Sequence, residues 1–445
     1  MEIKCSFLKQ SDLEYAVECL EVCKQEHARQ YGFHHPYFRP GGGYGEQWWQ
    51  LDSSLALSGY KWIDRNLAET SLWNFIESQK ADGRICLWGK DALPSQVAGA
   101  NFPKQTENVS SLPKLFDVAY HVVQGTTDDA LRVATYRMLK KYLDWWFLNR
   151  QDAKTGLITA VFEETFIPYL GYAGEYAPVD ANVEIYVGCH YTEQLAIELG
   201  KERDAQEIAR RKNSLKSSIN RWLWNEERGA YFAYFVNEGR LSDCLMASTF
   251  FPLRMNIADA DRQKRLIALL KNQEHFNWDV LPLTSVSMKD SAFVTTRGNY
   301  QGNASWSGNV WTLINEMVVR GLSDCGEKEL AAELAYKTIC ALNHNCAEFL
   351  NPFDGSGHGV VQYAWTASQY LELLIETVFG IAYRAGDRTV VVCPSLTEGM
   401  RKECFSIRKL RIADDIFMDI VIDHGVASCT VSDDSVRVEV KNDLQ

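Results

Sequence analysis

The sequence predicts a mainly helical fold, an (α/α)6 toroid of helical hairpins that carries a small C-terminal antiparallel β-module. Two observations predict it. Segments with apolar residues at helical period recur through the first 380 or so residues, and no strand pattern lies between them. Beyond that point short runs of β-branched residues alternate with turn signals. We therefore expect a helical domain over residues 1–382 and a β-module over residues 383–445.

The clearest predicted helix runs from Thr126 to Arg150. Thr126 and Asp129 suit a capping box, and apolar side chains follow at steps of three or four residues from Leu131 to Trp145. Repeated helical hairpins of this kind are typical of a solenoid or a toroid. Similar patterns predict helices near Asp12–Tyr31, Asp64–Gln79, Val183–Leu199, Arg203–Trp224, Asp259–Leu270, Val310–Arg320, Glu327–Leu342 and Thr366–Phe379.

The connections between these helices differ greatly in length, and the long ones hold most of the glycine, aromatic and acidic residues. They are His34–Trp49, Thr159–Val179, Leu281–Ser307 and Ala347–Ala364. Long ordered loops in a compact domain usually carry function. If these loops gather at one end of a toroid, they form a single cleft.

The C-terminal segment reads as strands rather than helices. Strands are expected at Arg388–Cys393, Cys404–Ile412, Ile416–Ile422, Ala427–Val431 and Ser435–Val440. No linker rich in Pro, Gly or Ser separates these strands from the helical part. We therefore expect the β-module to pack rigidly on the helical domain.

Composition excludes several classes of partner. The formal net charge is −12, which does not attract a polyanion, so nucleic acid and anionic membranes are poor partners. No run of about 18 apolar residues is present, so no transmembrane helix is expected. The first residues lack the apolar core of a secretory signal.

The 12 cysteines show no metal-ligand spacing, and their number does not by itself imply disulfides. No glycine-rich phosphate loop follows a predicted strand. We therefore expect a cytoplasmic protein without a metal or an organic cofactor. The oligomeric state stays open, and a homo-oligomer is one alternative.

Four loop clusters could carry chemistry, and the first contains Trp48, Trp49, Gln50 and Asp52. A carboxylate beside paired indoles suits sugar binding, because the apolar face of a pyranose stacks on an aromatic ring while the carboxylate accepts hydrogen bonds from hydroxyl groups. The alternative is a helix N-terminus in which Asp52 is the cap.

A second aromatic cluster contains Trp306, Gly308 and Trp311. Gly308 lacks a Cβ atom, so the backbone there can approach a neighbouring segment or a ligand closely. The alternative is the buried start of a core helix. Both interpretations place the two tryptophans close together.

The third cluster is acidic and contains Glu163 and Glu164, followed by Asp180. Aromatic residues lie between these acids in the sequence. Burial beside aromatic side chains raises the pKa of a carboxyl group, as a general acid requires. The alternative is a solvated acidic loop.

The fourth cluster begins at Glu348 and is followed by Tyr363 and Trp365. Hydrolysis of a glycoside needs two carboxyl groups on either side of one glycosidic oxygen, roughly 6.5–9.5 Å apart in inverting enzymes. The third and fourth clusters supply the two groups if the fold brings them face to face across an aromatic pocket. The alternative is a surface glutamate in an ordinary turn.

The order of these motifs resembles a known family. Trp49–Asp52, Asp180–Asn182, Trp306–Trp311 and the Glu348–Gly355 segment with Trp365 are similar to elements of the (α/α)6 glycosidases of the processing α-glucosidase I and mannosylglycerate hydrolase group, relatives of trehalase. The resemblance covers roughly residues 45–380. It implies an (α/α)6 barrel and inverting hydrolysis of an α-glucoside or α-mannoside, such as a small oligosaccharide or a glycosyl-glycerate.

The resemblance also implies roles for single residues. Glu348 takes the place of the general base. Relatives carry a Glu-Ser-Gly-x-Asp pattern whose Asp is the general acid, but here the sequence after Phe162 begins Glu163-Glu164-Thr165 and the expected Asp is missing. Glu164, Glu163 and Asp180 are the candidates to replace it. Ser307 stands where many relatives have Arg.

Two other functions remain open at this point. A sugar isomerase or epimerase on the same fold would use a pair of histidines for proton transfer, and His190, His344 and His358 are candidates. A sugar-binding protein without hydrolytic activity would have no carboxyl group opposite Glu348.

Overall fold

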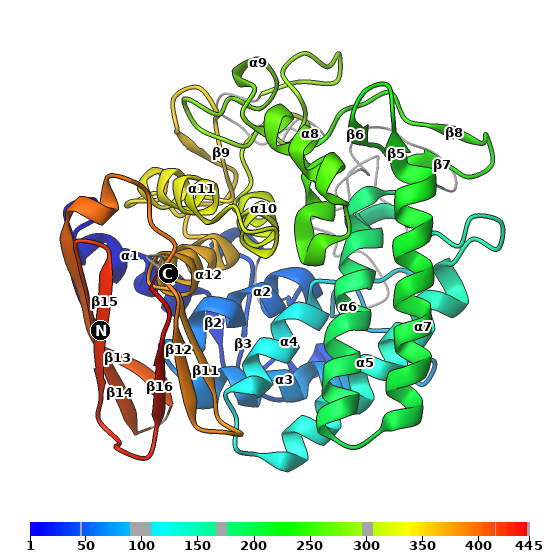
Figure 1. The fold of residues 1–445 in the computed structure, drawn as a ribbon. Helices are drawn as coiled ribbons and strands as arrows, with labels where there is room; N and C mark the ends of the chain where they lie inside the picture. Colours follow the sequence, from blue (N-terminus) through cyan, green and yellow to red (C-terminus); the bar gives the residue numbers. More distant parts are fainter. Residues whose placement is uncertain (45–46, 90–107, 166–175, 296–305, 414, 443–445) are drawn as a thin grey trace.

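The structure is a computed structural model, and it describes residues 1–44, 47–89, 108–165, 176–295, 306–413 and 415–442. Parts of three predicted loops, residues 45–46, 166–175 and 296–305, lie outside the described residues. Helices dominate up to residue 378 and strands dominate after it (Figure 1). The predicted mainly helical class is confirmed.

Six helical elements form a closed inner ring. Each packs against the next along the chain, and the last packs against the first (Figure 1). The ring therefore has one axis, and each element presents one end to either opening. The elements are α2 (Gln50–Tyr60), α4 (Leu115–Gln124), α6 (Val179–Glu198), η6 (Ala247–Asn256), α10 (Thr312–Asp324) and α12 (Ala364–Glu372).

The outer helices pack against this ring and keep one face in solvent. They are α1 (Gln10–Cys23), α3 (Arg65–Ser78), α5 (Asp129–Arg150), α7 (Glu202–Ser218), α8 (Ala260–Leu270) and α11 (Lys328–Ala341). In α5 the buried side chains include Leu131, Met138, Tyr142 and Trp145, which is the stripe that the sequence shows. In α2, by contrast, every residue is buried.

Shorter helical segments complete the helical part. They are η1 (Arg29–Tyr31), η2 (Gly42–Tyr44), η3 (Phe162–Glu164), η5 (Ile219–Leu223), α9 (Gln273–Phe276), η8 (Leu373–Val378) and η9 (Met400–Lys402). η2 and η3 matter below because they lie in the long loops at one end of the ring.

Two small sheets form the C-terminal part, and one of them includes the N-terminus. β1 (Glu2–Lys4), β13 (Cys404–Ala413), β14 (Ile416–Asp423) and β15 (Val426–Val431) form an antiparallel sheet in that order. In the second sheet β12 (Thr389–Val392) lies between β11 (Ile381–Arg384) and β16 (Arg437–Val440). The pairing of β12 with β16 is parallel, so the expectation of a wholly antiparallel module is wrong at this pair.

Two-residue strands tie the loops of the helical part together. They are β2 (Lys24–Gln25) with β3 (Tyr37–Phe38), β4 (Tyr176–Ala177) with β7 (Tyr234–Phe235) and β8 (Arg240–Leu241), β5 (Trp224–Asn225) with β6 (Ala230–Tyr231), and β9 (Phe349–Leu350) with β10 (Gly357–His358).

Several predicted helix limits differ from the structure. α1 ends at Cys23 rather than Tyr31, because the chain turns there into β2. Asp128, not Thr126, caps α5, since its side chain accepts hydrogen bonds from the backbone N–H groups of Ala130 and Leu131. The sequence patterns missed α2, α4 and η6, three elements of the inner ring.

Buried charged side chains fill the ring beneath its N-terminal ends. The Lys114 ammonium of the residue before α4 lies 2.8 Å from Asp117, 3.3 Å from Glu316 and 3.9 Å from Glu184. The positive charges of Lys114, Arg320 and Arg254 hold the pKa of Asp117 well below its usual range, although burial opposes this. Three ring helices, α4, α6 and α10, thus meet at one ammonium group.

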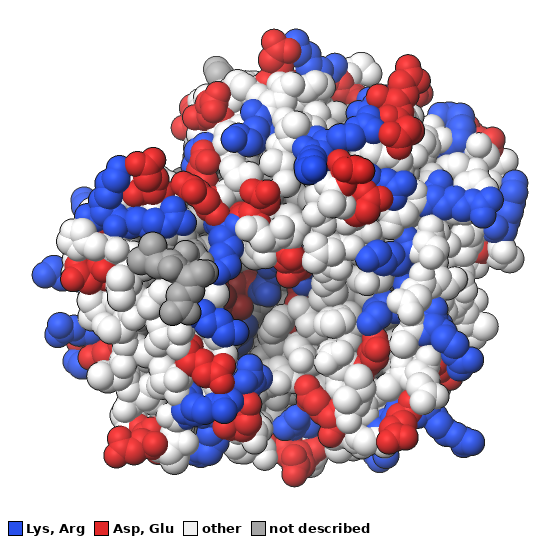
Figure 2. Space-filling model, in the orientation of Figure 1, with Lys and Arg blue, Asp and Glu red and all other residues white. Residues whose placement is uncertain are grey.

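A second cation joins α10 to the segment of α12 and η8. Arg320 pairs with Glu316, Glu372 and Glu376, and Glu376 also lies 2.6 Å from the Lys61 ammonium. On the face drawn in Figure 2, acidic and basic side chains are mixed over the surface and are also visible inside a central hollow. Buried side chains of both signs therefore pair with one another in the interior of the ring.

The closest approach of two ring helices is at Gly59 of α2. The Ser368 hydroxyl of α12 accepts a 2.7 Å hydrogen bond from the Gly59 N–H, and a Cβ atom at position 59 would lie 2.2 Å from the Ser368 carbonyl oxygen. No side chain fits there without displacing the backbone of α12. The contact between α2 and α12 that closes the ring therefore requires glycine at position 59.

We predict that Gly59→Ala destabilises the protein by about 1–3 kcal/mol, because the overpacking outweighs the gain in helix propensity of roughly 1 kcal/mol. Urea unfolding followed by circular dichroism measures the change. Gly399→Ala is the control, since its Cβ would meet no atom closer than 3.8 Å. Equal stabilities of the two variants would contradict the tight contact.

Candidate functional site

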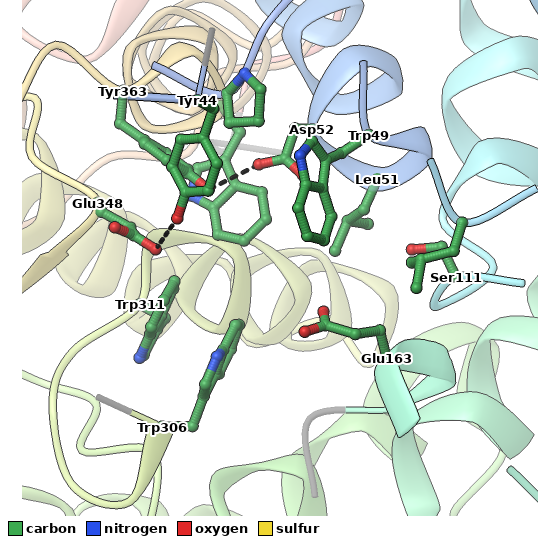
Figure 3. Close-up of a pocket in the computed structure, with 13 residues that line it drawn as sticks. Tyr44, Trp49, Leu51, Asp52, Ser111, Glu163, Trp306, Trp311, Glu348 and Tyr363 are labelled. Atoms are coloured by element: carbon green, nitrogen blue, oxygen red, sulfur yellow. Dashed lines mark hydrogen bonds between the residues drawn. The ribbon is translucent and has the colours of Figure 1, made fainter. Parts of the chain in front are cut away.

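A cavity opens at the N-terminal ends of the ring helices. Figure 3 shows aromatic rings and three carboxyl groups facing the cavity. The described lining consists of Pro40, Tyr44, Trp49, Leu51, Asp52, Leu87, Ser111, Glu163, Trp306, Trp311, Glu348, Tyr363 and Trp365.

The starts of three ring helices position much of this lining. Trp49, Trp311 and Tyr363 are the N-cap residues of α2, α10 and α12, and each has an extended backbone. An N-cap residue lies just outside the helix, so its side chain can turn away from the helix surface and into the space above it. The partial positive charge of a helix N-terminus also favours carboxylates nearby.

Glu348 lies immediately before β9 and is 5% exposed. Its Oε1 accepts a 3.2 Å hydrogen bond from the Tyr44 hydroxyl, and its Oε2 accepts one of 3.0 Å from the Val360 N–H. Two backbone hydrogen bonds between Val310 and Leu350 attach this loop to the start of α10. Burial raises the pKa of Glu348 to about 7, so both protonation states are populated near neutral pH.

Asp52 is the second buried carboxyl group of the cavity. It lies in the first turn of α2 without capping the helix, and it accepts a 2.7 Å hydrogen bond from the Tyr363 hydroxyl. Burial raises the pKa of Asp52 to about 8, and the negative charges of Glu348 and Glu163 act in the same direction. Asp52 is therefore largely protonated at neutral pH and can both donate and accept hydrogen bonds.

Glu163 supplies the third carboxyl group, from η3. Its side chain is half-buried and points into the cavity from the side opposite Glu348, with Trp306 and Trp311 below the space between them (Figure 3). Its charge raises the pKa of both Asp52 and Glu348. Glu163 of the third cluster and Glu348 of the fourth therefore line the same cavity.

The neighbouring Glu164 has a different environment. It is fully buried, and its two carboxylate oxygens accept hydrogen bonds from the Arg150 guanidinium at 2.7 and 2.8 Å. A third hydrogen bond, of 2.9 Å, comes from the Ser110 N–H. Glu164 does not line the cavity, and its contacts connect the acidic loop to α5 and to the segment before α4.

Stacked indoles form one wall of the cavity. The Trp306 and Trp311 rings are parallel, with centroids 3.6 Å apart and an interplanar angle of 4°. Trp365 meets Trp311 edge to face at 5.7 Å. Since Trp311 is nearly fully buried, Trp306 covers it and presents its own ring to the cavity.

Four other predicted site residues lie behind the lining. Trp48 stacks on Phe33, with ring centroids 3.9 Å apart, and belongs to the core. Gln50 is buried and donates to the Tyr142 hydroxyl at 3.0 Å. These two residues support the start of α2 without reaching the cavity.

Asp180 is fully buried, and the Thr165 hydroxyl, which lies 2.9 Å from both Asp180 carboxylate oxygens, donates its one hydrogen bond to this carboxylate. Gly308 provides the close backbone approach that the sequence indicated, because a Cβ atom there would lie 2.6 Å from the Val294 carbonyl oxygen. Neither residue is part of the described lining.

Sequence reasoning missed five lining residues, namely Pro40, Tyr44, Leu51, Leu87 and Ser111. Tyr44 lies in the long loop before Trp49, so its position among glycines was an available signal. Leu51 and Ser111 carry no such signal, because an aliphatic residue and a serine are common everywhere.

The three candidate histidines lie elsewhere. His344 pairs with Asp12 on the surface, His358 contacts the Ser356 hydroxyl, and His190 packs beside Tyr191. None of them is part of the described lining of the cavity. Within the described ranges, no group of three His, Cys, Asp or Glu side chains could hold a metal ion. No helix of the described residues is long and apolar enough to span a membrane.

This chain is similar to several known proteins. A family model described as "Mannosylglycerate hydrolase MGH1-like glycoside hydrolase domain" matches residues 45–165 and 168–366. A mannosylglycerate hydrolase of Rubrobacter radiotolerans is 29% identical over 187 residues, which are 41% of this chain and 40% of the relative. A periplasmic trehalase of Salmonella newport is 23% identical over 44% of this chain and 34% of the relative. The matches thus span less than half the length of these two curated relatives.

Solved structures show the same fold. The GH63 mannosylglycerate hydrolase of Thermus thermophilus, in complex with Tris and D-glycerate, superposes with a TM-score of 0.67 at 19% identity, over 82% of this chain and 100% of that one. Neutral trehalase of Saccharomyces cerevisiae superposes with a TM-score of 0.56 at 14% identity, over 84% of this chain and 80% of that one.

The different environments of Glu163 and Glu164 lead to a prediction about stability. Glu164→Ala should destabilise the protein by about 3–5 kcal/mol, because it leaves the Arg150 guanidinium without its buried partner. Glu163→Ala, at a half-buried position on the cavity, should cost about 1 kcal/mol or less. Urea unfolding measures both values. Similar losses for the two variants would show that Glu164 has no special structural role.

Proposed function

Because this chain belongs to the mannosylglycerate hydrolase MGH1-like glycoside hydrolase family, we propose that it hydrolyses an α-linked glucoside or mannoside with inversion at the anomeric carbon. The observation that carries the proposal is the placement of Glu348 and Glu163 on opposite sides of one aromatic cavity (Figure 3). An inverting enzyme needs this arrangement, with room for one water molecule on the side of the base.

Glu348 is the general base in this proposal. Its carboxylate removes a proton from the water that attacks the anomeric carbon. A group with a pKa of about 7 is suited to the task, since it is basic enough to accept a proton and is still substantially ionised near neutral pH.

Glu163 is the general acid. It faces the glycosidic oxygen from the opposite side and protonates it as the bond to the anomeric carbon breaks. Among the candidates named from the sequence, Glu164 is engaged by Arg150 and Asp180 by Thr165, whereas Glu163 lines the cavity. Position therefore favours Glu163.

The remaining lining residues bind the sugar. Trp49 and Trp306 offer ring faces for the apolar side of a pyranose. Asp52, held by Tyr363, is placed to hydrogen bond with sugar hydroxyl groups. Trp311 and Trp365 support the wall behind Trp306.

The relatives indicate a class of substrate. Two relatives are a mannosylglycerate hydrolase and a periplasmic trehalase, which suggests a glycosyl-glycerate or a small oligosaccharide as the substrate of this protein. The six-element ring supports the (α/α)6 toroid as the architecture of residues 1–382, with residues 383–445 as the β-module. The described cysteines form no disulfide bond, which suits a reducing compartment such as the cytoplasm.

We predict that Glu348→Gln abolishes turnover, lowering kcat at least about 10²–10⁴-fold, while folding and ligand binding persist. Proton NMR on a panel of α-linked disaccharides and glycosyl-glycerates reads the sugar released, and the β-anomer should appear first with the wild type. Near-normal turnover by Glu348→Gln would exclude Glu348 as the base.

The wild-type rate should rise with pH through about 7, because only the ionised Glu348 carboxylate accepts the proton.

We predict that the effect of Glu163→Gln depends on the leaving group. Hydrolysis of alkyl glycosides should fall about 10²–10⁴-fold, because these leaving groups need protonation, whereas an α-glycosyl fluoride should be hydrolysed at nearly the wild-type rate. Glu348→Gln should lose both activities. If Asp52→Asn instead showed this dependence, Asp52 would be the acid.

If the wild type releases sugar from no compound of the panel, it is not a hydrolase of this class, and the same spectra test the two other functions. Binding of the same sugars without conversion would indicate a sugar-binding protein, and conversion of one free sugar into another would indicate an isomerase or epimerase. Both outcomes are visible in the NMR spectra.

A further inference from the structure

The Glu348 carboxyl is held from two sides by groups of different origin. Its Oε2 accepts from the Val360 N–H, a backbone donor of the β9–β10 hairpin that carries Glu348 itself. Its Oε1 accepts from the Tyr44 hydroxyl, which belongs to η2, 304 residues away in the chain. The second donor is therefore a side chain that a separate loop places there.

The backbone beside Oε2 leaves this carboxyl little freedom. Gly359 has a φ of +74°, and a Cβ atom there would lie 2.4 Å from Oε2 and 2.8 Å from the Glu348 Cβ. The main chain thus lies directly against one side of the carboxyl group and blocks rotation toward that side. Rotation toward the cavity is opposed by the bond to Tyr44.

Tyr44 is itself fixed in place. Its ring makes edge-to-face contacts with Trp49 at 6.0 Å and Tyr363 at 6.2 Å, the N-cap residues of α2 and α12 (Figure 3). A Cβ atom on Gly41 would lie 2.6 Å from the Val360 side chain, so the η2 loop packs closely on the segment that follows Glu348. The position of the Tyr44 hydroxyl is therefore determined by both loops.

We propose that Tyr44 is a positioning residue for the general base: its hydroxyl holds the Glu348 carboxylate in the orientation that removes the proton from water. This proposal rests on the proposed function. Tyr44 donates its hydrogen bond to the ionised carboxylate and transfers no proton. A base within hydrogen-bond reach of the attacking water is effective only while its oxygen stays at that place.

Tyr44→Phe tests the proposal, because it removes one hydroxyl and keeps the ring. The matched control is Tyr136→Phe on α5, which removes a hydroxyl that donates to the Asp204 carboxylate at 2.5 Å, far from the lining. We expect kcat of Tyr44→Phe to fall about tenfold or more, as for the loss of a hydrogen bond to a charged group, with KM changed less than about twofold. Tyr136→Phe should keep the wild-type kcat.

The pH profile separates positioning from a merely structural role. The hydrogen bond from Tyr44 lowers the pKa of Glu348, so its loss should move the acid limb of kcat/KM to higher pH. The other ionisable groups that face Glu348, namely Asp52, Glu163 and Tyr363, are unchanged in both variants. Thermal unfolding of Tyr44→Phe should match that of the wild type.

A second measurement does not need activity. Infrared difference spectra of a protein against the same protein carrying Glu348→Gln isolate the titration of the Glu348 carboxyl. The midpoint of this titration should be higher in Tyr44→Phe than in the wild type, and it should be unchanged in Tyr136→Phe. An inactive wild type would refute the proposed function, while this midpoint would still test the contact. A wild-type kcat with an unchanged midpoint, or a rise of KM alone, would overturn the positioning role.

Discussion

The structure depends on the buried ion pairs that join the ring helices along its axis. The Lys114 ammonium meets carboxylates from α4, α6 and α10, and Arg320 joins α10 to the segment of α12 and η8. Such pairs add little net stability, but the loss of one partner leaves a buried charge uncompensated at a cost of about 3–5 kcal/mol. A sliding or rotation of one ring helix would break several pairs at once. The pairs therefore oppose sliding and rotation of α4, α6, α10 and α12 against one another.

The same helices carry the cavity, so the ion pairs also determine the site. Along α2 the cavity-lining residues Leu51 and Asp52 come first, and Leu55 and Ser58 border the buried charges one to two turns later. Trp49, Trp311 and Tyr363 occupy N-cap positions, so a shift of any of these helices would move an aromatic ring or the partner of Asp52. Burial then has a chemical consequence, since it raises the pKa of Glu348 and Asp52 into the neutral range.

The sequence predicted the outer helices better than the inner ones, for a physical reason. α5 and α8 keep a face in solvent, and their apolar residues therefore repeat at helical period. α2 is buried along its whole length and mixes Ser, Asp, Gly and Leu, so no amphipathic stripe exists to be found. In the site, an acid beside aromatic residues was enough to identify Asp52 and Glu348. Tyr44 and Ser111 were missed because their role arises only where distant loops meet.

The acidic loop contains two adjacent glutamates, Glu163 and Glu164, whose surroundings differ. The family resemblance leads one to expect an Asp two residues after a Glu-Ser-Gly segment, and this chain has the adjacent Glu163 and Glu164 instead. Sequence alone cannot rank them, because neighbouring residues differ only in the direction in which their side chains point. In the structure the Arg150 guanidinium and the Ser110 N–H engage Glu164 completely, which anchors η3 to α5 and to the start of α4. The preceding side chain, Glu163, points into the cavity. The buried Glu164 thus holds the loop from which Glu163, the proposed general acid, lines the cavity.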